Sequence, residues 1–140
     1  MLDISDLTTA IKSAINAAPG LTSVANKVFY GGVPENTAKP FVTLNVISTI
    51  QMPTMGNGSA VEIDRVLIQC SVFADGNGAL STANNTVKAI GTLFHRQKLT
   101  LANQSSINCE RKGARAIVEG RQPASLVYHS SVDIEFWVAS

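Results

Sequence analysis

The chain has 140 residues, 45% of them hydrophobic, and a formal net charge of +1. This length fits one domain with enough core to fold without disulfide or metal staples. The small net charge argues against a strong nucleic-acid-binding field, and the opening MLDISDL has neither the basic nor the apolar part of a signal peptide. Only 15% of the residues are charged, against about a quarter in typical domains. Part of the surface is therefore expected to face protein rather than water.

The first third of the chain predicts a helix, a short strand and an ordered loop. Asp3 or Ser5 can cap a helix whose apolar residues recur at three- and four-residue steps, and Pro19-Gly20 ends it. Lys27–Tyr30 is a short strand candidate. Val33–Pro40 contains two prolines and is expected to be an ordered loop.

Two long alternating segments follow, Phe41–Gln51 and Val61–Ala74, and the Asn57-Gly58 pair between them is a strong hairpin signal. We expect the two strands to pair antiparallel. At ~3.3 Å per residue they reach beyond what one helix layer covers, so the distal part of this long hairpin is expected to protrude from the core. The expected buried faces are Val42, Leu44, Val46 and Ile50 in the first strand, and Val66, Ile68, Cys70 and Val72 in the second.

A strand–turn–helix unit organises the middle of the chain. Four turn formers, Asp75 to Gly78, separate the second long strand from a predicted amphipathic helix over Ala79–His95. This helix is expected to lie back across the sheet. Its apolar stripe comprises Leu80, Ala83, Val87, Ile90 and Phe94.

The last third predicts three strands. Lys98–Ala102 reads as a short strand, and Ile107–Glu119 as a weak one with a bulge or loop near Gly113. Leu126–Val138 alternates clearly, although Trp137 falls on its otherwise polar face. The apolar face of this last strand comprises Tyr128, Val132, Ile134, Phe136 and Val138.

The sequence contains no catalytic or metal-binding constellation. His95 and His129 are far apart, and no HExxH, GxSxG or P-loop pattern occurs. His95 is expected to cap its helix, and His129 to lie at a surface or interface. Asp133 and Glu135 share a strand face and form either a carboxylate pair or, as we favour, a solvated polar face. We therefore predict that the chain is not an enzyme and uses no cofactor or metal.

The two cysteines, Cys70 and Cys109, are far apart and lack a CxxC pattern. Cys70 lies on the apolar face of its strand, which favours a buried reduced thiol over a disulfide. We predict that the two cysteines are not bonded to each other.

The predicted hairpin tip is the first candidate contact surface. No charge occurs between Pro40 and Val61, and the polar residues within this run exclude a membrane span. Uncharged, methionine-containing surfaces suit adaptable protein contacts. The alternative is a hairpin folded back onto its own domain. The candidate contact residues of the tip are Met52, Pro53, Met55 and Asn57.

A basic segment and an aromatic residue complete the candidate contacts. The segment could touch DNA phosphates or an acidic partner, and the alternative is a solvated or interface strand. Trp137, which falls on the otherwise polar face of the last strand, is the remaining candidate contact. The basic residues are Arg111, Lys112, Arg115 and Arg121.

Several segments together resemble the tail terminator, or tail-completion, proteins of long-tailed bacteriophages, the lambda-type terminator and its small relatives. They are KVFYGGVPENTAKPFVTLNVIS, EIDRVLIQCSVFADGNGALSTANNTVKAIGTLF and the closing VDIEFWV. The matching positions are Phe29, Tyr30, Gly31, Val33, Pro34, Pro40, Phe41, Val42, Val66–Ala79, Ala83, Asp133, Phe136 and Val138.

The resemblance implies an α+β fold with a twisted, mostly antiparallel sheet and two main helices packed on one face, all in one domain spanning 1–140. It implies a virion protein, assembled in the host cytoplasm, that forms a ring at the head-proximal end of the tail. The ring, usually a hexamer, caps the tail tube protein, stops its polymerisation and joins the head connector or neck protein, with DNA passing through the lumen. Other readings are a tube or connector subunit, or a small hydrolase or ligand-binding domain. No membrane partner is implied.

Overall fold

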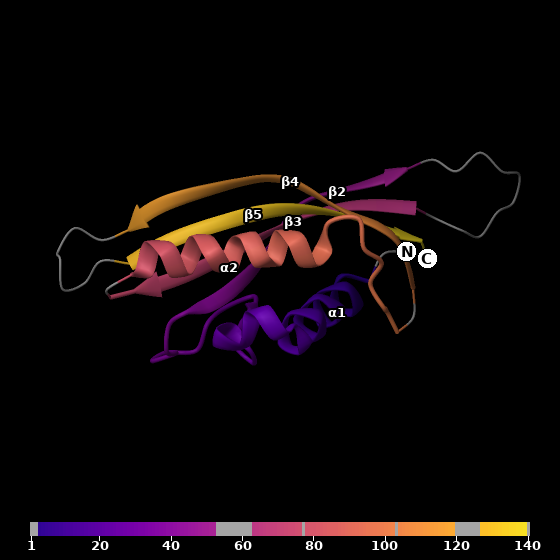
Figure 1. Cartoon of the computed structure of the whole chain (residues 1–140). Coiled ribbons are helices and arrows are strands. Elements are labelled where there is room, and N and C mark those ends of the chain that lie inside the picture. The colour runs from indigo at the N-terminus through magenta and orange to yellow at the C-terminus, as the bar shows by residue number, and fades with distance from the viewer. Residues whose placement is uncertain (1–2, 53–62, 77, 103, 120–126, 140) are drawn as a thin grey trace, which may run out of the picture.

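A computed structural model describes residues 3–52, 63–76, 78–102, 104–119 and 127–139, with the backbone alone in 105–107 and 115–119. A twisted sheet forms one layer and the helices form the other (Figure 1). The order of elements is α1 (Ile4–Ala17), a 3₁₀ helix η1 (Pro19–Val24), β1 (Val28–Tyr30), β2 (Phe41–Met52), β3 (Ile63–Asp75), α2 (Ala79–Phe94), β4 (Ser105–Glu119) and β5 (Val127–Ala139).

The sheet has five strands in the order β1-β2-β3-β5-β4. β1 is parallel to β2, and every other neighbouring pair is antiparallel. The expected pairing of the two long hairpin strands is confirmed, with Phe41 opposite Phe73 and Met52 opposite Ile63. Chain order and sheet order differ at the far side, because β5 inserts between β3 and β4.

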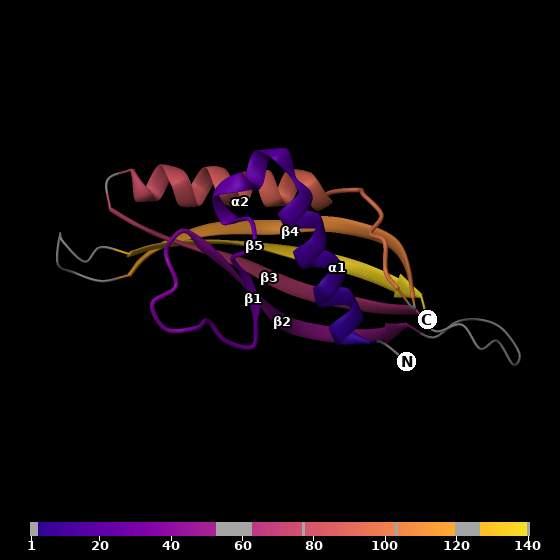
Figure 2. The ribbon, with the colours of Figure 1, turned by 90° about the horizontal axis from the view of Figure 1, so that it is seen from below.

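Both helices cover the same face of the sheet, as Figure 2 shows from below. α2 contacts β3 and β5, and α1 contacts β1 and η1. At the hairpin end β2 and β3 continue beyond the ends of both helices (Figure 1), as the strand lengths predicted. The α+β fold, the mostly antiparallel sheet and the helices on one face are therefore confirmed.

The core lies between the helices and the sheet. Phe94 of α2 meets Phe136 of β5 edge to face, with ring centroids 5.6 Å apart, which is a favourable aromatic geometry. Cys70 and Cys109 are buried thiols, in agreement with the prediction. The eight side chains whose burial the sequence most strongly predicts are all buried: Val66, Ile68, Cys70, Val87, Ile90, Phe94, Ile134 and Phe136.

Local rules explain the helix boundaries. The Asp3 carboxylate accepts a hydrogen bond from the Asp6 backbone N–H at 3.2 Å, so Asp3 is the N-cap of α1. α2 begins after Gly78, whose φ of 75° lies in the left-handed region that favours glycine. α2 ends at Phe94, and His95 is its C-cap.

A β-bulge in β2 corrects one predicted face. The register shifts between Val46 and Ser48, so the strand changes phase at Ile47. Val46 keeps its place on the helix side, but Ile50, predicted to be buried with it, lies opposite Arg65 and is 52% exposed. Strict alternation fails here because one extra residue moves every later side chain to the other face.

The strand predicted over Lys98–Ala102 is also wrong. This segment has no strand partner in the described part of the chain and runs past the start of α1, where the Ala102 N–H donates to the Asp6 carboxylate at 3.0 Å. Its alternation has another cause, since Leu99 and Leu101 pack against the core from an irregular segment. β4 begins at Ser105, earlier than expected, and the bulge predicted near Gly113 is confirmed.

Candidate assembly surface

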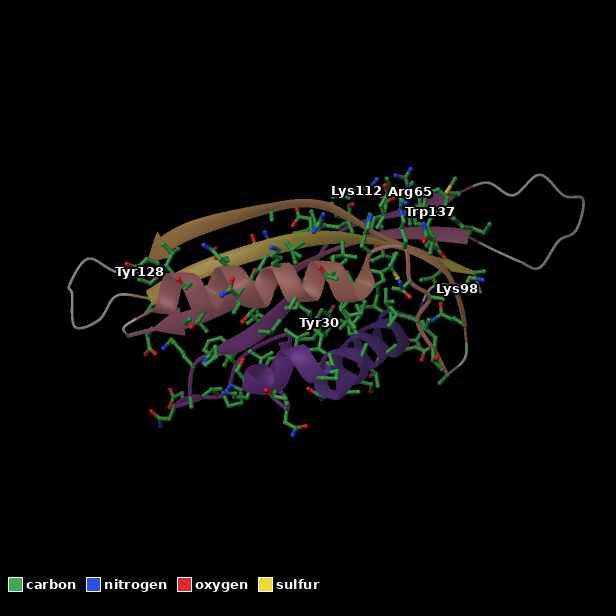
Figure 3. All side chains as sticks on the ribbon, viewed as in Figure 1. Tyr30, Arg65, Lys98, Lys112, Tyr128 and Trp137 are labelled. Atoms are coloured by element: carbon green, nitrogen blue, oxygen red, sulfur yellow. The ribbon has the colours of Figure 1, made fainter. Side chains whose placement is uncertain are left out.

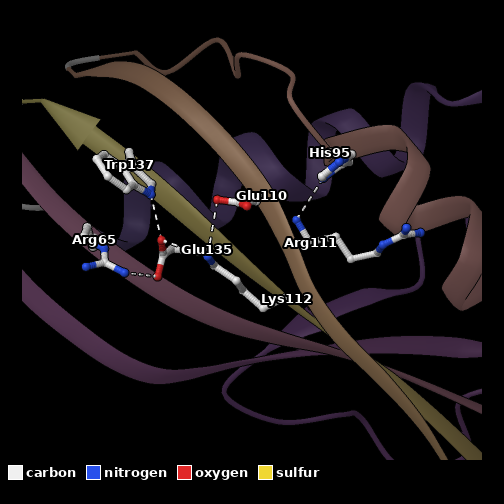
Figure 4. Close-up of polar contacts among 7 residues, drawn as sticks. All are labelled: Arg65, His95, Glu110, Arg111, Lys112, Glu135 and Trp137. Atoms are coloured by element: carbon white, nitrogen blue, oxygen red, sulfur yellow. Dashed lines mark hydrogen bonds and ion pairs between the residues drawn. The ribbon is translucent and has the colours of Figure 1, made fainter.

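The sheet face opposite the helices carries a compact charged cluster near the hairpin end (Figure 3). It consists of Arg65, Glu110, Lys112, Glu135 and Trp137, which we call the Glu135 cluster (Figure 4). The Arg65 guanidinium donates to Glu135 Oε2 at 2.9 Å, and the indole N–H of Trp137 donates to Glu135 Oε1 at 2.8 Å. The Lys112 ammonium lies 3.3 Å from Glu110 and 3.8 Å from Glu135.

Strand register builds this cluster. Arg65 of β3 lies opposite Trp137 of β5, and Glu110 of β4 lies opposite Glu135. The Arg65 guanidinium carbon stands 5.2 Å from the centre of the Trp137 ring, within the range of a cation–π contact. The aromatic residue that interrupts the polar face of β5 is therefore held by Arg65 and Glu135.

Glu135 is nearly buried, with a residue exposure of 7%. The prediction of a solvated polar face at Asp133 and Glu135 is therefore wrong for Glu135. Burial by itself raises the pKa of Glu135, but the hydrogen bonds from Arg65 and Trp137 and the charges of Arg65 and Lys112 outweigh it, so the pKa is lowered below its ordinary value. The carboxylate is ionised and held at neutral pH.

The opposite end of the same face carries a row of stacked aromatic side chains. Phe41 and Phe73 stack with centroids 5.3 Å apart, and Phe73 stacks on His129 at 4.4 Å. Phe29 of β1 meets Phe41 edge to face at 6.3 Å. All four side chains are half-buried. His129, predicted to lie at a surface or interface, is half-buried opposite Phe73 in this row.

Arg111 and Lys112, the two residues of the predicted basic segment whose side chains the structure describes, lie on different faces of the sheet. Lys112 joins the Glu135 cluster, whereas Arg111 lies toward α2, where its Cδ would be 2.8 Å from a Cβ added at Gly91. The bulge between Arg111 and Gly113 separates the two cations. The backbone of Arg115 pairs with Ser131, its side chain lies outside the described residues, and so does Arg121.

The end of α2 is fastened to β4. The Arg111 backbone N–H donates to Nδ1 of His95 at 3.2 Å, and the Arg96 N–H donates to the Cys109 carbonyl at 2.7 Å. His95 is the C-cap residue of α2 through its backbone N–H, which donates to the Gly91 carbonyl, and its ring accepts a hydrogen bond from the edge of β4. The bonds of His95 and Arg96 to β4 cover its outer edge over Cys109–Arg111.

Next to that edge a groove of about 440 Å³ runs between α2 and β4. Val87 and Val132 contribute apolar surface, and Lys88 and Arg111 bring positive charge. The full lining is Asn84, Val87, Lys88, Arg111, Lys112, Gly113, Ala114, Ser130 and Val132.

The hairpin arm, which we define as Asn45–Met52 of β2, is mostly exposed. Ile47 and Ile50 are 51% and 52% exposed. Met52 is half-buried opposite Ile63. The other predicted tip contacts, Pro53, Met55 and Asn57, lie outside the described residues.

The described surfaces offer exposed apolar side chains and charged groups, which suit protein contacts. Within the described ranges, no group of three or more His, Cys, Asp or Glu side chains could hold a metal ion. None of the described helices is both long enough and apolar enough to cross a membrane. Sequence reasoning missed Arg65, Glu110 and the exposed Ile47, because their roles depend on strand register and on a bulge that leave no separate signal in the sequence.

Comparison with known proteins identifies the family of the chain. No curated protein sequence gives a match. The chain is similar to a chain in a solved structure described as the virion of a native gene transfer agent particle, with a TM-score of 0.71 and 18% identity over 98% of this chain and 97% of that one. At this identity the likeness shows a shared fold. The sequence model of the tail completion protein gp17 family matches residues 9–139. The chain therefore belongs to the tail completion protein gp17 family and is a structural protein of the phage virion tail.

Proposed function

We propose that this chain forms a ring, in the expected case a hexamer, that caps the head-proximal end of the tail tube. The ring ends polymerisation of the tube protein and presents the surface to which the head connector or neck protein binds. The hairpin arm carries the proposal, because it is an uncharged stretch of β2 that extends beyond the helix layer and exposes Ile47 and Ile50. A bare edge of this kind invites pairing with another chain.

The cap requires binding surfaces and no catalytic step, and we propose that the chain is not an enzyme. Its contacts are copies of itself, the tube protein and the connector. The uncovered sheet face is a second surface available for these contacts. It carries the Glu135 cluster at one end and the stacked side chains of Phe41, Phe73 and His129 at the other. Arg111 and Lys112 lie on different faces of the sheet, so these two residues do not support a continuous DNA-facing patch. The passage of DNA through the lumen is proposed from the ring geometry alone.

A double substitution, Met52→Asp with Met55→Asp, tests the role of the hairpin. Met52 lies at the end of β2 beyond the helix layer, so the variant should melt like the parent by circular dichroism. An unpaired carboxylate buried in a contact is costly, so the variant should cap tails poorly and yield tails of irregular, excessive length in electron micrographs.

A matched control is Thr9→Asp with Ser13→Asp, which adds the same charge on the exposed side of α1. The control should give tails of normal length. If the hairpin variant also gives normal tails, the proposed role of the hairpin is wrong. If particles made without the protein lack tube subunits altogether, the tube-subunit reading replaces the cap.

A further inference from the structure

We infer that neighbouring copies in the ring are joined by strand addition, in which the hairpin arm of one copy pairs with the open half of β4 in the next copy. This inference rests on the proposed ring and adds the contact that builds it. The partner is a second copy of this chain. The open half of β4 is Lys112–Glu119, and the hairpin arm is Asn45–Met52.

The hairpin arm has an unpaired edge. β1 pairs only with Val42–Leu44, so the rest of β2 has no strand neighbour on that side within the described residues. The arm has no charged residue, although charge is the usual protection of an edge strand. Three of the four large hydrophobic side chains found exposed in the described chain, those of Tyr30, Ile47 and Ile50, belong to β1 and β2 on this side of the sheet.

The second unpaired edge belongs to β4, the last strand at the opposite side of the sheet. Its edge over Cys109–Arg111 is already covered, because His95 and Arg96 bond to the backbone of Arg111 and Cys109. The second half, Lys112–Glu119, has no such cover among the described contacts. Both open stretches are eight residues long, which at ~3.3 Å per residue is about 26 Å of backbone each.

The groove between α2 and β4 adjoins this open half. Val87, Ala114 and Val132 lie along it, on the helix side of the sheet. A strand added to β4 would place alternate side chains over this groove, so the site offers side-chain contacts as well as backbone hydrogen bonds.

Strand direction favours a head-to-tail contact. β2 and β4 run in opposite directions, because β2–β3, β3–β5 and β5–β4 are all antiparallel. A neighbour whose sheet continues the first one therefore presents its β2 antiparallel to β4, which is the dominant pairing of this sheet. The two open stretches also lie at opposite ends of the sheet along the strand direction. Met52 pairs with Ile63, which pairs with Ala139 at the end of β5, whereas Glu119 pairs with Val127 at the start of β5. A contact between two different surfaces is heterologous, and such contacts close into rings when the rotation allows it.

Two variants separate the two halves of the contact. Ile47→Lys with Ile50→Lys places lysines on the exposed hairpin arm, and Ala114→Lys places one at the exposed groove beside β4. Both change exposed side chains, and both should melt like the parent. The control, Thr9→Lys with Ser13→Lys, should assemble like the parent.

Light scattering after size exclusion measures the outcome over a concentration series. Each variant alone should remain a monomer of 14.8 kDa. An equal mixture should give one-to-one dimers of twice that mass and nothing larger, because only one intact contact remains between the two variants. The parent should form the full ring.

Three results would overturn the inference. Rings formed by either variant alone, or by the equal mixture of the two, would show that these edges do not build a head-to-tail contact. A parent that stays monomeric at every concentration would exclude a stable strand-addition contact. The length of tails made with the parent tests the proposed cap separately. If the parent gives tails of normal length and the variants still form rings, the edge contact is refuted and the proposed function stands.

Discussion

Replacement of Glu135 by glutamine tests whether the Glu135 cluster stabilises the uncovered sheet face. Glutamine keeps the shape of the side chain and can still accept the Trp137 N–H. It removes the negative charge that Arg65 and Lys112 face at 2.9 and 3.8 Å. The Glu135 side chain is only 10% exposed, whereas its partners Arg65 and Lys112 are 33% and 40% exposed.

The expected loss can be bounded from these exposures. A hydrogen bond to a charged group contributes about 1.5–3 kcal/mol to stability, and an exposed ion pair about 0–1 kcal/mol. Because both cations are partly solvated, screening by water reduces the contribution of the hydrogen bond to the charged group. Glu135→Gln should therefore lower the free energy of unfolding by about 1–2 kcal/mol at pH 7.

The loss should depend on pH. The folded-state pKa of Glu135 is lowered relative to the unfolded chain, so its contribution is fully present above the ordinary carboxyl pKa of about 4.3. It disappears as the pH falls through the lower folded-state value and Glu135 is protonated in both states. The parent and the Glu135→Gln variant should thus differ at pH 7 and converge below that folded-state pKa.

Urea unfolding followed by circular dichroism, at a series of pH values, measures this difference. A double-mutant cycle with Arg65→Met, which keeps the side-chain stem, isolates the pairwise part, expected to be about 1 kcal/mol. A loss that is unchanged through the acid range, or a coupling energy near zero, would show that Glu135 acts through packing and not through its charge.

Three further predictions concern the core and the helix junctions. Phe136→Ala should lower stability by about 3–5 kcal/mol in urea unfolding, because Phe136 is fully buried against Phe94; a loss below about 1 kcal/mol would contradict this packing. Gly91→Ala should be near neutral, since the gain in helix propensity of about 1 kcal/mol is offset by displacing the Arg111 side chain. Combining Gly91→Ala with Arg111→Ala should recover the gain in helix propensity. If Gly91→Ala alone already stabilises the protein by about 1 kcal/mol, Arg111 does not press against position 91. Asp3→Ala should cost about 0.5–2 kcal/mol by removing the cap of α1, measured by thermal melting, and an unchanged melting temperature would refute the capping role.

Much of the fold follows from local patterns. The period of two in Phe41–Gln51 and Val61–Ala74 predicted the hairpin, and the apolar stripe of Ala79–His95 predicted α2 within one residue. These predictions hold because a segment that must bury one face against a single layer carries that requirement in its own spacing. The pattern of Lys98–Ala102 misled, because leucines that touch the core from an irregular segment alternate in the same way as a strand.

The candidate contacts show where local patterns stop. The sequence identified an uncharged hairpin, a basic segment and Trp137, but it could not show that Arg111 and Lys112 diverge. One bulge sets their directions, and a bulge is fixed by pairing with β5 rather than by the residues of β4 alone.

The sequence by itself determined the class of the fold and the buried faces of most strands. It also determined that the chain belongs to the tail completion protein family. Only the tertiary structure decided which surfaces remain open. Arg65, Lys112, Glu135 and Trp137 come from three strands, and they meet because β5 inserts between β3 and β4. The same insertion leaves β4 at the sheet edge. Strand order and register depend on pairing between residues far apart in the chain, and spacing within a segment carries no record of them.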